Sequence, residues 1–267
     1  MRRPSLLISD LDRTILTHDH ALPPRVADAF ARAQQRGLRI VIATARSPRG
    51  LRRYLDVLPV SDVCICFNGG WIGDPRSGKA MRNHTIARDC ATSAFGLIQA
   101  LEMTALWYAG DEVYATRDDD IVRRESSITG ESLRIVPRVD DIPVAANKIM
   151  CVALTSDAQR RFEKVREFCA GMLETSRSHA RLLEIAPKGI DKADAANFVC
   201  KMLGVSREHT AAAGDAQNDL RMLQQVGFPV TVANALPEIR RIAMFIAPSC
   251  DEGGMAEAVE WLLTQAT

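Results

Sequence analysis

Short apolar runs alternate with amphipathic stretches over the first part of the chain. The apolar run at residues 6–9 leads directly into two aspartates, and a second run at residues 38–44 ends in polar residues. Between them, residues 25–36 have a helical pattern, and Gly37 behind them is a natural helix C-cap. The pattern continues with a helix at 47–58 and a strand at 63–67 that ends at Asn68-Gly69-Gly70. This alternation predicts parallel βαβ units, with helices on the faces of the sheet.

The middle of the chain has a different pattern, which predicts an α+β domain inserted at residues 83–187. Two helical stretches, at 87–102 and 157–173, are separated and followed by short strand-like runs at 105–108, 112–115, 148–154 and 182–185. Asp118-Asp119-Asp120 is interpreted as a solvated loop or a helix start.

The βα pattern then resumes, with helices expected at 190–203, 220–226 and 255–264 and strands at 210–214, 228–232 and 243–246. Residues 1–82 and 188–267 would therefore form one α/β, Rossmann-like core around a parallel sheet, interrupted by the insert.

Composition narrows the class of protein. The formal net charge is +1, so no global field attracts nucleic acid or a membrane surface. No apolar run reaches the roughly 20 residues of a membrane span. Seven cysteines without a CxxC pair, among them Cys64, Cys66, Cys151 and Cys200, are interpreted as reduced core residues. We expect a cytoplasmic protein.

Asp10 and Asp12 are the strongest candidates for chemistry. Side chains two apart on an extended backbone point the same way, so both carboxylates would project toward one ligand. Two neighbouring anions indicate a cation or a proton between them, and aspartate can also accept a phosphoryl group as a nucleophile. A solvated turn after a strand is the alternative.

A second group of polar residues follows a predicted strand in the segment GDAQND, residues 214–219. Mg²⁺ prefers oxygen ligands, usually one or two carboxylates with several waters. Asp215 is suited to direct ligation, while Asn218 and Asp219 could orient the waters of the ion or a neighbouring lysine. Alternatively, Asp219 could simply be the N-cap of a helix.

The segment KGIDK, residues 188–192, supplies a cation. Asp191 is a plausible N-cap, which would place Lys192 in the first helical turn. A lysine there opposes the helix dipole, so we expect a counter-anion nearby. Lys188 competes for the same role and ranks second, and an ordinary surface lysine is the alternative.

Thr44, Arg46, Asn68 and Gly69 are candidate phosphate or substrate contacts. They follow the second and third predicted strands, and ligands of parallel sheets sit outside the carboxyl ends of the strands. A hydroxyl group with exposed backbone N–H groups can hold a phosphate, although a tight turn would also explain Asn68-Gly69.

The order DLDRT, TAR, KGIDK and GDAQND resembles the four motifs of the haloacid dehalogenase-like phosphohydrolases. The large insert between the second and third motifs resembles the Cof-type branch, class IIB, whose substrates are largely sugar phosphates and other small phosphomonoesters. Segments near the end of the chain, at 228–230, 232–235 and 251–254, are also similar to that branch.

The resemblance implies a role for each motif. Asp10 would be the nucleophile and a metal ligand, and Asp12 the general acid/base, with its backbone carbonyl a second ligand. Thr44 and Lys192 would bind the phosphoryl group, and Asp215, helped by Asp219, would complete a Mg²⁺ site. Arg13 and Ala45 depart from the family pattern, because glycine is usual at both positions.

The function expected from this resemblance is Mg²⁺-dependent hydrolysis of a small phosphorylated metabolite, a sugar phosphate, through an aspartyl phosphate. A phosphomutase and a non-catalytic phospho-ligand-binding protein are the alternatives. The insert would act as a cap that sets specificity, with Lys148 the favoured contact in it. A monomer or a homodimer is expected.

Overall fold

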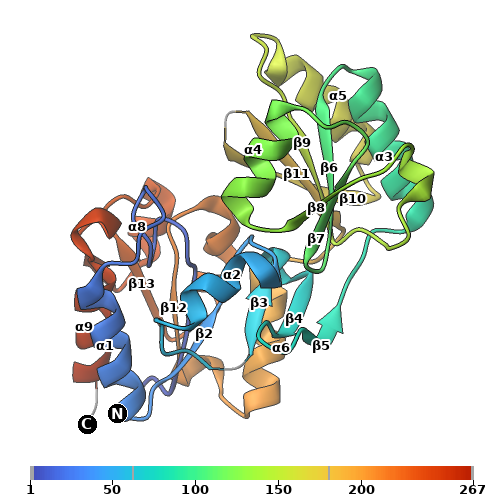
Figure 1. Cartoon of the computed structure of the whole chain (residues 1–267). Coiled ribbons are helices and arrows are strands. Elements are labelled where there is room, and N and C mark those ends of the chain that lie inside the picture. Colours follow the sequence, from blue (N-terminus) through green and yellow to red (C-terminus); the bar gives the residue numbers. More distant parts are fainter. Residues whose placement is uncertain (1–2, 62, 180, 266–267) are drawn as a thin grey trace. The chain divides into compact units, whose positions relative to one another are not determined.

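The computed structural model describes residues 3–61, 63–179 and 181–265. The chain divides into two compact units (Figure 1). The core unit contains Met1–Ala45, Leu51–Ala80 and Asp191–Thr267, and the inserted unit contains Arg46–Gly50 and Met81–Ile190. Each unit is described by itself below.

The core unit is built on a five-stranded parallel sheet with the order β14-β13-β12-β1-β2. The strands are β1 (Leu6–Ser9), β2 (Arg39–Ile42), β12 (Thr210–Ala213), β13 (Phe228–Val232) and β14 (Phe245–Ala247). All four residues of β1 are buried, as expected for a central parallel strand that is covered on both faces. Ser9 is in register with Ile42 on one side and with Ala213 on the other, so three strands end together.

Helices cover both faces of this sheet. They are α1 (Pro24–Gln35), α2 (Pro48–Leu55), α6 (Lys192–Leu203), α7 (Leu220–Leu223), α8 (Pro237–Ile242) and α9 (Met255–Thr264), and α2 begins within the segment assigned to the inserted unit. Helices α1 and α9 lie side by side (Figure 1). Ala195, Ala196 and Val199 of α6 are buried in one hydrophobic cluster with Leu6 and Ile8 of β1.

A small sheet extends the core unit beyond β2. It contains β3 (Cys64–Cys66), β4 (Trp71–Asp74) and β5 (Lys79–Asn83), and β3 is antiparallel to β4. The last three residues of β5 are assigned to the inserted unit. A parallel bridge between Ala43 and Ile65 joins it to the end of β2. The segment after β3 is thereby held beside the carboxyl ends of the parallel strands.

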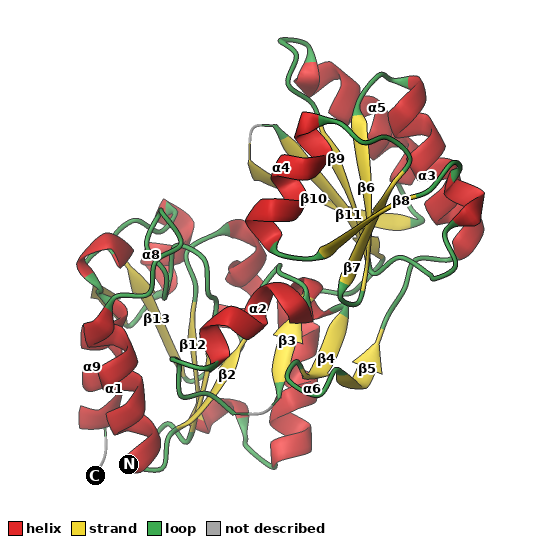
Figure 2. Cartoon of the chain, viewed as in Figure 1, coloured by secondary structure: helices red, strands yellow, loops and turns green. Residues whose placement is uncertain are grey.

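The inserted unit contains a six-stranded sheet with the order β10-β11-β9-β6-β7-β8 (Figure 2). Its strands are β6 (Thr104–Ala109), β7 (Glu112–Ala115), β8 (Ser132–Ile135), β9 (Lys148–Val152), β10 (Leu173–His179) and β11 (Leu182–Pro187), and its helices are α3 (Arg88–Ala100), α4 (Asp120–Thr129) and α5 (Ala158–Cys169). Alternate residues of β6 and β9, such as Trp107 and Ile149, form one core with Phe95 of α3 and Phe162 of α5.

The α/β fold class with an inserted α+β unit is confirmed, but several predicted elements were wrong in extent. The helix expected at 157–173 ends at Cys169, because Gly171 has a φ of +80° and Leu173 already begins β10. The helix expected at 220–226 is only one turn long, Leu220–Leu223. Strands β4, β5, β8 and β10 and helix α8 were not predicted. In the described part of the chain, no helix is long and apolar enough to cross a membrane.

Candidate active site

Three aspartates meet at the carboxyl edge of the parallel sheet. Asp10 directly follows β1, and its backbone N–H donates to the carbonyl of Ala213 at 2.9 Å, at the end of the neighbouring strand β12. Carboxylate oxygens of Asp10, Asp215 and Asp219 all lie within 4.8 Å of one another. The three residues are at most 6% exposed. The two strongest motifs of the sequence thus converge on one buried acidic cluster.

Lys192 supplies the positive charge of this cluster. Asp191 is the N-cap of α6, as predicted, and its side chain accepts a hydrogen bond from Asp194 N–H at 2.8 Å. Lys192 is the first residue of the helix and is fully buried. Its Nζ donates to Asp10 Oδ1 at 2.5 Å and to Asp219 Oδ1 at 2.7 Å.

Asp219 is held by donors on both of its oxygens. Oδ1 accepts from Lys192, and Oδ2 accepts from the backbone N–H groups of Asp215 and Ala216, at 3.1 and 3.0 Å. Gly214 makes this approach possible, because a Cβ there would lie 2.4 Å from Asp219 Cβ and Cγ. Asp219 therefore aligns Lys192 and the Asp215 backbone, a positioning role that suits it better than direct ligation of a metal.

Burial and mutual repulsion perturb the acids of the cluster. Burial raises the pKa of Asp10 well above its usual range, Lys192 partly opposes this, and the neighbouring carboxylates raise it further. Burial and then repulsion from Asp219 raise the pKa of Asp215 to about 6, against the opposing effects of Lys192 and Arg13. Burial acts to lower the pKa of Lys192, but Asp10 and Asp219 outweigh it and raise this pKa. Such perturbation is typical of functional sites.

The donor chemistry of the cluster fits a divalent cation. Three carboxylates and one ammonium leave a formal charge of −2, and the donors are oxygen atoms, which Mg²⁺ prefers. Asp215 is oriented by the Thr14 hydroxyl, which donates to its Oδ1 at 3.2 Å. The sequence did not indicate this contact. Asp10 and Asp215 are the residues that would hold the ion.

Asp12 lies at the exposed side of the loop after β1, and its side chain is 30% exposed. His20 Nδ1 lies 2.9 Å from Asp12 Oδ1, and the His20 carbonyl accepts from the Tyr54 hydroxyl at 3.2 Å. Sequence reasoning missed His20. Its backbone φ of +59° turns the side chain back toward Asp12, and no hydrophobic or motif pattern signals such a turn.

Thr44 and Asn68 lie at the ends of neighbouring strands, as expected. Thr44 is fully buried and its N–H donates to the carbonyl of Ile65, while Asn68 N–H donates to the carbonyl of Thr44 at 2.9 Å. Asn218 Nδ2 donates to Asn68 Oδ1 at 3.0 Å, which links two of the predicted site residues.

Gly69 controls how closely this segment approaches α6. Its φ is +108°, and an added Cβ would lie 2.6 Å from the carbonyl oxygen of Asp191. Glycine is therefore needed both for its backbone conformation and for the space beside the residue that precedes Lys192.

Arg46, Lys148 and Lys188 belong to the inserted unit. Arg46 is buried. Lys148 Nζ lies 3.5 Å from Glu184 and 4.9 Å from the centre of the Tyr108 ring. Lys188 Nζ donates to the carbonyl of Gly171 at 2.8 Å. Of the two competing lysines, Lys192 is the one that contacts the carboxylates.

Arg13, where the family usually has glycine, has a φ of +60°. That left-handed conformation explains why glycine is common at this position. The arginine carbonyl accepts from Asn234 Nδ2 at 2.8 Å, and its guanidinium lies 3.1 Å from His18 Nε2.

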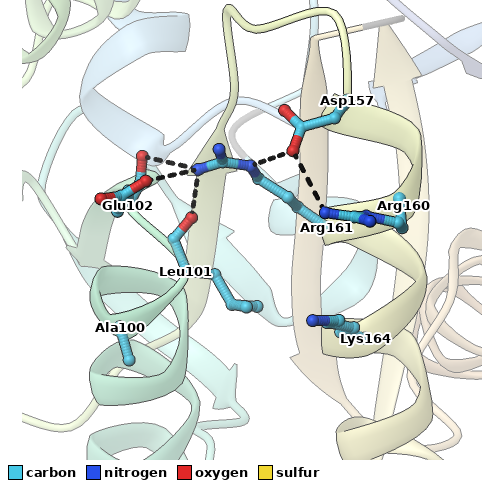
Figure 3. Close-up of a pocket in the computed structure, with 7 residues that line it drawn as sticks. All are labelled: Ala100, Leu101, Glu102, Asp157, Arg160, Arg161 and Lys164. Carbon is cyan, nitrogen blue, oxygen red and sulfur yellow. Dashed lines mark hydrogen bonds and ion pairs between the residues drawn. The ribbon is translucent and has the colours of Figure 1, made fainter.

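Figure 3 shows a separate pocket of about 170 Å³ in the inserted unit, between the end of α3 and the start of α5. Arg161 crosses it, donating to Asp157 at 2.9 Å and to the carbonyl of Leu101 at 2.5 Å. Arg161 thereby provides a hydrogen-bond donor to a carbonyl group at the C-terminal end of α3. The pocket contains none of the predicted site residues.

The family of haloacid dehalogenase-like hydrolases matches residues 7–259. Since this match spans most of the 267 residues, the chain belongs to that family. The family and the enzyme class that the four motifs implied are both confirmed.

Known relatives resemble the chain over almost its whole length. It is 26% identical to a Bacillus subtilis protein named "Putative phosphatase YxeH", over 97% of this chain and 98% of that protein. A haloacid dehalogenase-like hydrolase from Bacteroides thetaiotaomicron has a similar structure, with a TM-score of 0.88 at 26% identity, covering 97% of this chain and all of that one. The HAD subclass IIB sugar phosphatase BT4131 shares the fold, with a TM-score of 0.81 at 17% identity over 96% of this chain and 98% of its own.

Proposed function

We propose that the chain is a Mg²⁺-dependent phosphatase that hydrolyses a small phosphorylated metabolite, a sugar phosphate, through an aspartyl phosphate on Asp10. The observation that carries the proposal is the buried contact of Lys192 with Asp10 and Asp219, beside Asp215. Burial of a lysine beside three carboxylates is costly because each charge loses its hydration, so an arrangement of this kind indicates a function. The name of the B. subtilis relative supports the same activity.

In the first step, an Asp10 carboxylate oxygen attacks phosphorus in line with the leaving alkoxide. The phosphorus–alkoxide bond breaks, and Asp12 donates its proton to the alkoxide. Lys192 faces the attacking carboxylate and offsets negative charge on the phosphoryl oxygens. Thr44, at the same edge of the sheet, is the proposed phosphoryl ligand.

In the second step, water attacks the phosphorus of the aspartyl phosphate and Asp12 takes a proton from it. The bond between phosphorus and Asp10 breaks, which releases inorganic phosphate and restores the Asp10 carboxylate and the protonated Asp12. The contact of Asp12 with His20 at 2.9 Å keeps the carboxyl group in one orientation for both proton transfers.

When bound, Mg²⁺ would screen the phosphoryl oxygens and neutralise the excess charge of the cluster. Asp10 and Asp215 would hold it, with the backbone carbonyl of Asp12 as a third ligand. All seven cysteines of the chain are free thiols, which fits our proposal of a cytoplasmic enzyme.

The test is phosphate release from p-nitrophenyl phosphate and a panel of sugar phosphates, with Mg²⁺ or with EDTA. Wild type should turn over only with Mg²⁺, and Asp10→Asn should be inactive. Asp12→Asn should lose about 10²–10⁴-fold in turnover, the usual contribution of a general acid/base. Asp28→Asn, an exposed aspartate on α1, is the matched control and should resemble wild type.

If wild type and Asp10→Asn are equally inactive across a broad panel, hydrolysis is the wrong assignment. Product analysis with a labelled hexose 1-phosphate separates release of phosphate from its transfer to another hydroxyl group, which a phosphomutase would perform.

A further inference from the structure

A second cluster of metal-type ligands lies outside the three aspartates, in the core unit. His18, Cys250 and Asp251 each offer one ligand atom, and these atoms lie within 4.8 Å of one another. His18 belongs to the loop after β1, whereas Cys250 and Asp251 begin the 3₁₀ helix Cys250–Glu252. Residues more than 230 positions apart are thus brought together.

The contacts converge on one atom, His18 Nδ1. It lies 2.8 Å from Asp251 Oδ2 and 3.6 Å from Cys250 Sγ, and Cys250 Sγ lies 3.8 Å from Asp251 Oδ1. In a nucleophilic triad, the thiol and the carboxylate contact opposite nitrogens of the imidazole ring. Here the thiol and the carboxylate face the same nitrogen, so the three side chains do not form a nucleophilic triad. Three ligand atoms that face one point suit a shared metal ion.

The distances are close to those of a tetrahedral zinc site. Zn–S bonds of about 2.3 Å and Zn–N bonds of about 2.0 Å place sulfur and nitrogen about 3.5 Å apart in a tetrahedron. The observed Sγ–Nδ1 separation is 3.6 Å. The nitrogen and the carboxylate oxygen, now 2.8 Å apart in a hydrogen bond, would need to separate by only about 0.5 Å to reach tetrahedral spacing.

The loop is also held in position by its backbone. His18 N–H donates to Asp251 Oδ1 at 2.9 Å, which fixes the carboxylate beside the imidazole. Asn234 joins the same elements, since its Nδ2 donates to the Arg13 carbonyl and its Oδ1 accepts from Cys250 N–H at 2.9 Å. The ligand set is therefore preorganised on both sides.

We propose that His18, Cys250 and Asp251 form a second metal site, which binds Zn²⁺ or a similar thiolate-preferring divalent ion with water in the fourth position. The side chains of His18 and Asp251 are 43% and 53% exposed, so an ion and a water molecule can reach them. Three protein ligands and one open position define this class of zinc site. The thiolate separates it chemically from the all-oxygen cluster of Asp10, Asp215 and Asp219.

Binding requires a defined change of protonation. Arg13 can only donate, so its 3.1 Å contact makes His18 Nε2 the acceptor and leaves the ring proton on Nδ1, toward Asp251. On binding, this proton moves to Nε2, the Arg13 contact opens, and the metal takes the Nδ1 lone pair. Cys250 releases its thiol proton to solvent, so one proton is released for each ion bound.

Titration with Co²⁺ tests the site directly. Reduced, chelator-treated full-length protein in excess Mg²⁺ should develop a thiolate-to-cobalt charge-transfer absorption that saturates at one ion per chain and is removed by Zn²⁺. Cys250→Ser should abolish this absorption, and Cys200→Ala, which removes another buried thiol of the core unit, should keep it.

His18→Gln and Asp251→Asn change exposed side chains and leave the thiol in place. Each should weaken Zn²⁺ binding, measured by competition with a chromophoric chelator, by more than the roughly 10–100-fold that loss of an outer-shell partner costs. Absence of the absorption in wild type, or its persistence in Cys250→Ser, would overturn the proposal. Asp10→Asn should keep the absorption, which separates this test from that of the phosphatase function.

Discussion

Substitution of Gly214 by alanine tests how strongly the active site depends on the position of one carboxylate. An alanine Cβ at this position would lie 2.4 Å from Asp219 Cβ and Cγ, where ordinary contacts begin at 3.4 Å. The atoms in the way are the base of a side chain, not its flexible end. Residue 214 is itself held by the hydrogen bond from Thr231 Oγ1 to its carbonyl, at 2.6 Å. Asp219 must therefore move by about 1 Å.

A shift of this size should lower the rate of catalysis while the protein still folds. Asp219 aligns Lys192, so the ammonium would no longer face Asp10 correctly. A 1 Å misplacement near a reacting centre can cost about 100-fold, or about 2.7 kcal/mol of transition-state stabilisation. Overpacking of a buried position costs the fold about 1–3 kcal/mol.

The measurement is kcat/KM for Mg²⁺-dependent phosphate release, taken well below the Tm of each variant. Gly96→Ala is the matched control, because an alanine at this helical position meets no atom within 4 Å. It should retain full activity. If Gly214→Ala stays folded and keeps kcat/KM within twofold of wild type, the role assigned to Asp219 is refuted.

Four further predictions concern the same cluster. Gly69→Ala should lower both stability and activity, because its Cβ would displace the Asp191 carbonyl at the start of α6; activity equal to wild type would contradict this. Lys192→Met should lower the free energy of unfolding by about 3–5 kcal/mol in EDTA, measured in urea, since it leaves buried carboxylates uncompensated; an unchanged midpoint would argue against the buried ion pair. A pKa of Asp215 raised to about 6 means that the folded state binds this proton more tightly than the unfolded state. The free energy of unfolding of the metal-free protein should therefore decrease as the pH rises from about 4 to about 6, by up to about 3 kcal/mol relative to Asp215→Asn. An equal pH dependence of the two proteins would exclude the raised pKa. Mg²⁺ at 100 times its Kd should stabilise wild type by about 2.7 kcal/mol in thermal unfolding, and Asp215→Asn should lose this gain; an equal gain in both would place the ion elsewhere.

The sequence was sufficient to predict the site residues that follow the ends of parallel strands. Asp10 and Asp215 each follow a strand, and the carboxyl ends of parallel strands meet at one edge, so their convergence could be expected before any coordinates. Lys192 could also be placed, because Asp191 has the chemistry of an N-cap.

Other features gave no usable pattern. Strand β5 is mostly exposed and β8 has no fully buried residue, so neither has the apolar alternation that marks a strand. The contact of His20 with Asp12 depends on a positive φ, and Thr14 reaches Asp215 across 201 positions. Such contacts are decided by tertiary packing, which local sequence does not encode.

The strand order of the core unit also constrains how the protein can be made. Leu6 of β1 pairs with Arg39 soon after synthesis, but its other neighbour, Thr210, follows about two hundred positions later. At about 5–20 residues per second, a ribosome needs about 10–40 s to reach it. During that interval the apolar β1 has an open edge. The segment Met81–Ile190, which makes up most of the inserted unit, is synthesised before β12 and can fold first. Newly made chains should therefore depend on chaperones until β12 emerges.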